Sequence, residues 1–272
     1  MLYCQVANGK DPRGYSRKLS MQHNVKFFVI NLDRSPERLA ECQNKFSSIG
    51  ISLERISAVD GKANDLSSFF DDEACRKEMG RSIQPGEVGC FLSHVNAIQK
   101  FWEGDAEYAV ILEDDALPSD DFLQTLEELI RGFRRDTFET YAVNLGASDF
   151  KYSSNYRTLG SGMLRCAHRF PMLATGILWS RSGAKLFLDD HKTITQPYDN
   201  YLRFLLSGTN KAFSVRPSMV MASGAASDIE ARNVSRRRSS QNRSHFYFFF
   251  KQRRIIREKV RALVGKVRWL IR

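Results

Sequence analysis

The sequence predicts an α/β fold in which strands and helices alternate along one large domain. Short apolar runs rich in β-branched or aromatic residues recur from residue 25 onward, and helical periodicity fills the stretches between them. The chain has 272 residues, of which 42% are hydrophobic, which is enough to bury a sizeable core. Alternating strand and helix signals over residues 25–206 are typical of an α/β sandwich.

The expected elements follow in order. Apolar runs predict strands at residues 25–32, 51–59, 108–112, 141–145 and 172–179. Helical patterns lie at residues 35–46, 69–79, 88–102, 122–133, 182–188 and 201–206. Pro36 suits a first helical turn, and Phe91, Val95, Ile98 and Trp102 recur at helical spacing.

Three consecutive carboxylates, Glu113, Asp114 and Asp115, follow the strand expected at residues 108–112. One strand end cannot bury three adjacent carboxylates without opposing charge, because desolvation and mutual repulsion favour their protonated forms. Open α/β sheets bind ligands beyond the carboxyl ends of their strands, and oxygen ligands suit Mn²⁺ or Mg²⁺ carrying a substrate phosphate. A solvated acidic turn is the alternative, and the triplet alone does not decide between them.

Polar residues at other element ends are further candidates. Asn31, Arg34 and Arg38 fall at the end of the first strand and the first turn of the next helix, where they can present donors to a nucleotide or diphosphate. Ordinary helix charge is the alternative. Asp199 falls at the expected start of helix 201–206, either as an N-cap or as a carboxylate that accepts a proton in the cleft. His94 lies within helix 88–102, where a lone histidine is more often structural than catalytic.

The cysteines and the N-terminal residues predict a cellular location. The five cysteines, Cys4, Cys42, Cys75, Cys90 and Cys166, are scattered and show no C-x-x-C pair. This argues against a disulfide framework and a zinc site and favours a reducing cytosol. Residues 1–24 form a polar extension without an apolar stretch of signal-peptide length, and no run of about 18 apolar residues occurs. We therefore expect a cytoplasmic protein that does not span a membrane, with Met1 or Met21 as its native start.

Basicity is confined to the C-terminal tail, residues 231–272. The net charge is +10, but residues 232–272 contain 14 Lys or Arg against one acid, Glu258, which leaves −3 for the rest of the chain. Within the helix expected at residues 253–271, the aliphatic residues Ile256, Val260, Leu263, Val267 and Leu270 recur in steps of four and three, flanked by lysines and arginines.

This pattern is typical of an interfacial amphipathic helix. It predicts docking on an anionic membrane surface through residues 246–272, on the inner face of the plasma membrane. A helix packed on the domain with a solvated basic face is the first alternative. A nucleic-acid tail around Arg236–Arg238 is the second, and it is disfavoured because the body of the chain is not basic.

Six stretches of the chain match one pattern in order, namely Phe28–Arg34 with Arg38, Ala58–Gly61, Gly86–His94, Ile111–Asp115, Ser180–Ala184 and Pro197–Leu202. Together they resemble glycosyltransferase family 25, which includes bacterial lipooligosaccharide galactosyltransferases and collagen galactosyltransferases. The resemblance covers about residues 25–230, and the missing secretory signal disfavours a collagen-type role.

The resemblance implies a GT-A-like α/β/α sandwich that binds a nucleotide sugar. It further implies inverting transfer of a hexose from UDP-galactose or UDP-glucose to a lipid-linked oligosaccharide acceptor, the lipopolysaccharide or lipooligosaccharide core. Because the acidic triplet is intact, we do not expect an inactive relative. The competing hypothesis is a non-catalytic membrane- or nucleic-acid-binding protein that retains the fold.

The resemblance also implies roles for individual residues. Asp199 is the expected base, with His94 as the second choice. The metal would be Mn²⁺ or Mg²⁺. Its expected ligands are Glu113, Asp114 and Asp115, and the expected donor-binding residues are Asn31, Arg34, Arg38, Asp60, Glu87, Ser93 and Asp114.

Overall fold

The computed structural model describes residues 24–136, 138–147, 151–223 and 243–271. The expectations for residues 1–23, for the choice between Met1 and Met21 and for Arg236–Arg238 lie outside the described residues. Within the described ranges, none of the helices has the length and apolar character needed to cross a membrane.

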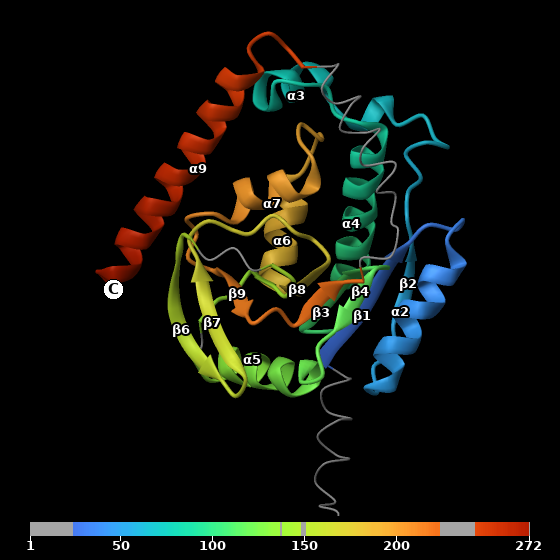
Figure 1. The fold of residues 1–272 in the computed structure, drawn as a ribbon, viewed down its shortest axis with the longest axis vertical. Coiled ribbons are helices and arrows are strands. Elements are labelled where there is room, and N and C mark those ends of the chain that lie inside the picture. Colours follow the sequence, from blue (N-terminus) through green and yellow to red (C-terminus); the bar gives the residue numbers. More distant parts are fainter. Residues whose placement is uncertain (1–23, 137, 148–150, 224–242, 272) are drawn as a thin grey trace, which may run out of the picture.

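An eight-stranded mixed sheet forms the centre of the molecule, in the order β2-β1-β3-β8-β5-β9-β7-β6 (Figure 1). Its strands are β1 (Val25–Asn31), β2 (Glu54–Ser57), β3 (Tyr108–Glu113), β5 (Ala142–Asn144), β6 (Ser153–Leu159), β7 (Gly162–Ala167), β8 (Gly176–Ser180) and β9 (Ala212–Arg216). Strand β1 pairs in parallel with both β2 and β3. The carboxyl ends of these three strands therefore meet at one edge of the sheet. Two short strands, β4 (Ala116–Pro118) and β10 (Val220–Ala222), pair antiparallel beside it.

Helices cover both faces of the sheet, so the expected α/β sandwich is confirmed. One face packs against α3 (Asp72–Met79), α4 (Pro85–Glu103), α6 (Arg181–Asp190) and α7 (Tyr198–Leu206). The other packs against α2 (Pro36–Ser48) and α5 (Phe122–Asp136). Alternation along β3 sends Ala109 and Ile111 into the first layer and Val110 and Leu112 into the second. The run is apolar throughout because both of its faces are buried.

Several boundaries differ from the expected ones. The strand expected at 51–59 is only β2, and the one expected at 172–179 is β8, at residues 176–180. The hairpin of β6 and β7 was not predicted, because β6 reads SSNYRTL and shows no apolar run. The helix expected from residue 201 begins at Tyr198 with Pro197 as its N-cap. Asp199 therefore lies in the first helical turn, and the interpretation of Asp199 as an N-cap is wrong.

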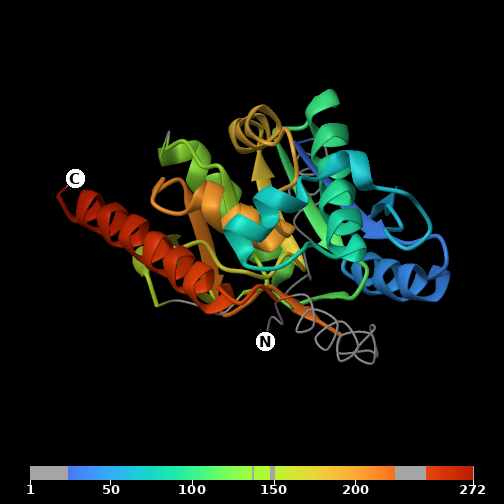
Figure 2. The ribbon, with the colours of Figure 1, turned by 90° about the horizontal axis from the view of Figure 1, so that it is seen from above.

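The C-terminal helix α9 (Tyr247–Leu270) begins six residues earlier than expected and runs along one side of the domain, starting beside α3 (Figures 1 and 2). Its packing face combines small and charged residues with Trp269, whose ring packs against Phe138 and Tyr156. Glu258, Ala262 and Gly265 are its buried residues. A Cβ on Gly265 would lie 2.8 Å from the Cα of Gly208, so only glycine allows this approach.

The aliphatic face of α9 points away from the domain. Ile256, Val260, Leu263, Val267 and Leu270 are each more than half exposed, at 59, 53, 51, 57 and 70%. The helix thus packs on the domain, which the first alternative for the tail predicts, but the face that it leaves to solvent is the aliphatic one. It contacts the domain through Glu258, Ala262, Gly265 and Trp269, and the apolar stripe that the sequence predicts remains on the surface.

Candidate active site

A cleft of about 410 Å³ opens where the carboxyl ends of β1, β2 and β3 meet the first half of α4. A second hollow of about 730 Å³ shares a wall with it and extends to Phe69 and Asn96. The shared wall is formed by Leu32, Arg34, Ala58, Val59 and Asp60. Most of the expected site residues line the cleft, namely Arg34, Arg38, Asp60, Ser93, His94, Glu113, Asp114 and Asp115.

The three carboxylates of the triplet have different surroundings. Glu113 ends β3 on the same face as Ile111, and therefore points toward α4. Asp114 turns to the opposite side and meets Arg38 of α2. Asp115 lies in the turn between β3 and β4 and opens into the same cleft. The strand end divides the charge between its two faces, which reduces the repulsion expected from three adjacent carboxylates.

Both oxygens of Asp114 bind protein donors. Its Oδ2 accepts a hydrogen bond from Asn31 Nδ2 at 2.7 Å, and its Oδ1 is paired with the Arg38 guanidinium. The side chain of Asp114 is only 10% exposed. Burial raises the pKa of its carboxyl group, and the opposing effects of Asn31 and Arg38 only partly offset this rise. Asn31 in turn accepts a hydrogen bond from Arg55 at 3.1 Å. Asp114 thus fixes the relative positions of β1, α2 and β3.

The wall shared by the two hollows is held by charge and by close backbone packing. Arg34 and Asp60 form an ion pair. The hydroxyl of Ser93 accepts a hydrogen bond from Val59 N at 2.8 Å and donates to Gly89 O at 2.6 Å. A Cβ on Gly89 would lie 2.4 Å from Val59 O. Ser93 therefore ties α4 to the loop after β2, and Gly89 permits the contact.

Glu87 has a local structural partner. Its carboxylate accepts hydrogen bonds from Arg81 at 2.6 and 2.8 Å and from Gln84 N at 2.9 Å, which completes a capping box at the start of α4. It does not line the cleft. Gly86, one residue earlier, does line it, and a Cβ there would have no neighbouring atom within 4 Å. The glycine therefore leaves room in the cleft.

His94 is buried at the inner end of the cleft, where only 1% of the residue is exposed. Its ring stacks on Tyr198, with ring centroids 3.8 Å apart and an interplanar angle of 9°. Its Nε2 lies 3.8 Å from Glu113 Oε1, beyond hydrogen-bond length, and its Nδ1 has no hydrogen-bond partner within the described ranges. Cys90, one helical turn before His94, lies on the same side of α4 and lines the cleft.

Asp199 lies in the first turn of α7, near enough to Glu113 for the two carboxylates to interact, and it does not line the cleft. The pKa of Asp199 is raised to about 7, mainly because its carboxyl group is removed from water and also because the Glu113 carboxylate repels its charge. Arg203 opposes the shift. A carboxyl group with a pKa near neutrality suits proton transfer at neutral pH.

The donor chemistry of the cleft fits a divalent cation. Glu113, at the end of β3, and Asp115, in the turn that follows, supply carboxylate oxygens, and Glu113 is 35% exposed. Such hard oxygen donors are the ligands that Mg²⁺ and Mn²⁺ prefer. The metal role expected of Asp114 stays a prediction. In the structure both of its oxygens are engaged by Asn31 and Arg38.

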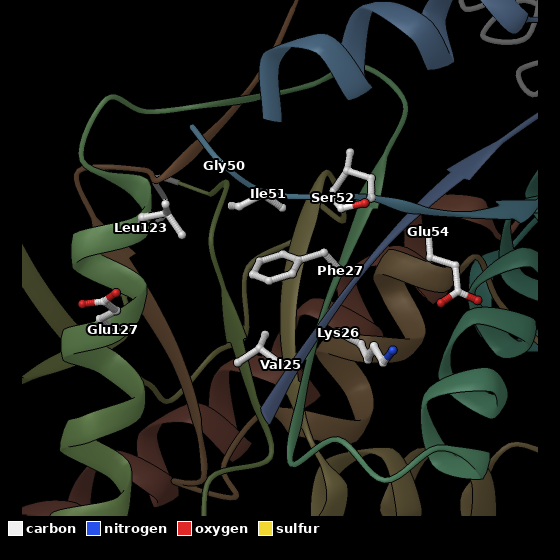
Figure 3. Close-up of a pocket in the computed structure, with 10 residues that line it drawn as sticks. Val25, Lys26, Phe27, Gly50, Ile51, Ser52, Glu54, Leu123 and Glu127 are labelled. Atoms are coloured by element: carbon white, nitrogen blue, oxygen red, sulfur yellow. The ribbon is translucent and has the colours of Figure 1, made fainter. Parts of the chain in front are cut away.

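A further cavity, of about 300 Å³, lies at the opposite edge of the sheet (Figure 3). It opens at the amino ends of β1 and β2, around Phe27 and Ile51, and is also bordered by Leu123 of α5. None of the expected site residues lines it. It is separate from the carboxyl-edge cleft.

Sequence reasoning did not single out four residues of the site. Cys90 and Gly86 stand inside the matched Gly86–His94 block, which the resemblance places along the donor cleft, but neither was named as a site residue. Arg55 and Tyr198 gave no signal, because their partners Asn31 and His94 are remote in sequence.

Residues 24–202 match the family described as glycosyltransferase family 25 (LPS biosynthesis protein). This match spans well over half of the chain, and it falls on the elements that build the cleft. The chain therefore belongs to glycosyltransferase family 25.

Relatives of known name agree with this membership. A glycosyltransferase 25 family member of Aedes aegypti is 27% identical over 72% of this chain and 33% of its own length. Procollagen galactosyltransferase 2 of Mus musculus is 22% identical over 72% of this chain and 34% of its own. A third relative, also from Mus musculus, is the inactive glycosyltransferase 25 family member 3, at 25% identity over 79% of this chain and 39% of its own.

The chain matches at most about two fifths of the length of these relatives. A crystal structure of S. aureus TarS 1-349 aligns with a TM-score of 0.42 and 13% identity, over 72% of this chain and 60% of that one, a likeness too low to bear on fold or function. Family membership thus leaves substrates and activity to be argued from the cleft.

Proposed function

We propose that the protein is an inverting, metal-dependent hexosyltransferase that uses UDP-galactose or UDP-glucose and acts on a lipid-linked oligosaccharide of the lipopolysaccharide or lipooligosaccharide core. The single observation that supports it most is the cleft itself. Two carboxylates that line it, Glu113 and Asp115, stand beside Arg34 and Arg38 at the carboxyl edge of parallel strands. This combination suits a cation and the diphosphate that it accompanies.

Each residue has a role in this proposal. Glu113 and Asp115 hold the Mn²⁺ or Mg²⁺ ion, which when bound neutralises charge on the departing diphosphate. Arg34 donates to the diphosphate and Asp60 accepts from the nucleoside. Asp114 keeps Arg38 and Asn31 in place at the strand edge.

The base must lie on the side of the sugar opposite to the leaving group. Asp199 is our first choice, because the environment that raises its pKa to about 7 makes its carboxylate more basic than an ordinary one. His94 remains the second choice. Its ring is buried against Tyr198, which limits its reach to an acceptor hydroxyl.

We also propose that α9 docks the enzyme on an anionic membrane surface, on the inner face of the plasma membrane. The aliphatic stripe of α9 faces solvent and is flanked by basic side chains. A helix with these two properties lies in the interface of an anionic bilayer. Docking would bring the cleft to an acceptor that is itself anchored in lipid.

The test of the catalytic proposal is UDP release from UDP-galactose and from UDP-glucose, with and without Mn²⁺, in the presence of extracted lipooligosaccharide. We expect release that depends on acceptor and metal and is lost in Asp115→Asn. Lys45→Gln, on the exposed surface of α2, is the matched control. Absence of UDP binding to the wild type would favour a non-catalytic binding protein instead.

A further inference from the structure

Cys90, His94 and Glu113 bring three different ligand types together at the inner end of the cleft. One ligand atom from each, the Cys90 sulfur, a His94 ring nitrogen and a Glu113 oxygen, lies within 4.8 Å of the other two. Cys90 and His94 come from successive turns of α4, and Glu113 comes from the end of β3. The three residues meet only because α4 packs against the sheet, so no C-x-x-C motif in the sequence predicts this cluster.

The imidazole is the fixed member of the group. His94 is 1% exposed and stacked on Tyr198, so its ring has little freedom to turn. Its Nε2 faces Glu113 Oε1 at 3.8 Å, and neither ring nitrogen makes a hydrogen bond among the described residues. A buried imidazole without hydrogen bonds loses its hydration without replacement. A cation at Nε2 would supply that missing interaction.

The other two ligands are able to move. Cys90 is exposed in the cleft and Glu113 is 35% exposed. Ligand atoms in a tetrahedral zinc site lie about 3.5 Å apart, as follows from zinc–ligand bonds of about 2.0–2.3 Å. Closing from 4.8 Å to that spacing requires shifts of about 1 Å, within reach of a rotation of either side chain. The cleft provides the entry path.

We propose that Cys90, His94 and Glu113 form a site for Zn²⁺ or a similar borderline-soft divalent ion, with the fourth coordination position open to the cleft. Three protein ligands and one open position are typical of non-structural zinc sites. Thiolate and imidazole ligands select Zn²⁺ over Mg²⁺ and Mn²⁺, which prefer oxygen. The site therefore differs in ligand chemistry from the pair Glu113 and Asp115, although it shares Glu113.

Sharing Glu113 has a consequence that rests on the proposed function. A Zn²⁺ ion held by Cys90 and His94 draws Glu113 toward α4 and away from Asp115. Zn²⁺ then competes with Mn²⁺ and inhibits transfer. The binding of Zn²⁺ itself does not depend on transferase activity.

The test uses Co²⁺ as a spectroscopic probe on the full chain in excess Mg²⁺, without donor or acceptor. We expect one equivalent of Co²⁺ to give a thiolate-to-cobalt charge-transfer band, and Zn²⁺ to abolish it by displacement. In Cys90→Ala the band should disappear, and the affinity for Zn²⁺, measured against a chromophoric chelator, should fall at least about tenfold. Cys75→Ala is the matched control, since this cysteine is buried under α9 in α3 and should leave both readouts unchanged.

Cys90 is exposed, so its substitution should leave the fold intact, which circular dichroism checks. His94→Gln provides a second variant, expected to weaken Zn²⁺ binding while keeping the Cys90 thiol. The proposal is overturned if Cys90→Ala keeps the band and the affinity, or if the wild type binds no Zn²⁺ in excess Mg²⁺. Metal-dependent UDP release that persists in that second case would leave the transferase proposal standing.

Discussion

Asp114 and Glu258 are both nearly buried carboxylates paired with arginine. The net charge of the groups around Asp114 is negative, whereas that of the groups around Glu258 is positive. Asp114, 10% exposed, pairs with Arg38 but stands between two further carboxylates. Glu258, 8% exposed, lies within 2.7 Å of Arg169, 3.7 Å of Arg254 and 3.9 Å of Arg203. The cleft therefore has a surplus of negative charge and the contact beneath α9 a surplus of positive charge.

The difference separates a site from a structural contact. A negative surplus in an open cleft attracts a cation that the protein does not itself supply. The positive surplus around Glu258 lies under α9, where a single acid from the tail joins arginines of the domain. That acid positions the helix so that its aliphatic face stays outward.

The largest expected effect comes from removing a cleft carboxylate that has access to a ligand. Asp115→Asn should lower kcat by about 10³-fold, because a neutral amide oxygen binds a divalent cation more weakly than a charged carboxylate does. Thermal unfolding should change little. Activity retained within about threefold would show that the negative surplus at Asp115 has no catalytic role.

The second prediction concerns the contact beneath α9. Glu258→Gln removes the charge that three arginines share, and should lower the free energy of unfolding by about 3 kcal/mol. Denaturant titration measures it. Glu73→Gln is the matched control on the exposed face of α3, where the ion pair with Lys77 is open to solvent and should contribute little to stability. Equal effects of the two substitutions would contradict the interpretation of Glu258 as a buried contact.

The third prediction is a pH dependence at Asp199, whose folded-state pKa is raised to about 7 from an ordinary value of 3.8. Between these two values the unfolded chain ionises and the folded one does not, so this group lowers stability as pH rises toward 7. The loss is complete above pH 7 and absent below about pH 4. Asp199→Asn should remove a pH-dependent loss of about 4 kcal/mol.

Ionisation of Asp199 should raise activity as pH rises, although it lowers stability over the same range. If Asp199 is the base, log(kcat/KM) rises with pH and levels off near pH 7, and Asp199→Asn lowers kcat by about 10²–10⁴-fold. A flat profile between pH 5 and 8 in the wild type would contradict the assignment of Asp199 as the base.

The smallest expected effect lies on the outer face of α9. Leu263→Ser should weaken binding to phosphatidylglycerol vesicles by about tenfold, because a buried leucine contributes about 1.5 kcal/mol or more. Met221→Ser is the control, since Met221 is similarly exposed, at 56% against 51% for Leu263, but lies on β10. Vesicles of neutral lipid should bind weakly in every case, because they lack the anionic partner of the basic residues. Equal sedimentation of both variants would exclude docking through this face.

Periodicity and strand-end chemistry made the class of fold and the location of the cleft predictable from the sequence. The run at residues 108–112 reads as a two-sided buried strand, and the carboxylates after it mark the ligand edge. What could not be predicted depends on long-range pairing. The bonds of Asp114 to Asn31 and Arg38 join residues separated by 83 and 76 positions. No local pattern distinguishes Asp114 from its two neighbours.

In the tail, the apolar pattern of the helix was predictable, but its packing against the domain was not. The steps of four and three along Ile256–Leu270 predict an aliphatic stripe, and the structure confirms that this stripe is exposed. Which side of α9 would meet the domain was not predictable. That choice depends on Gly208 opposite Gly265 and on arginines in remote segments, which meet only in the folded chain.

The buried position of Ala262 and Gly265 has a practical consequence for shortening the protein. Removing a basic amphipathic C-terminus is a common way to improve the behaviour of a purified enzyme. Here a chain that stops before α9 would expose the surface around Gly208 and strip Arg169 of its carboxylate partner. Substituting the exposed aliphatic residues of α9, with its inner face left intact, should instead improve solubility while keeping the fold.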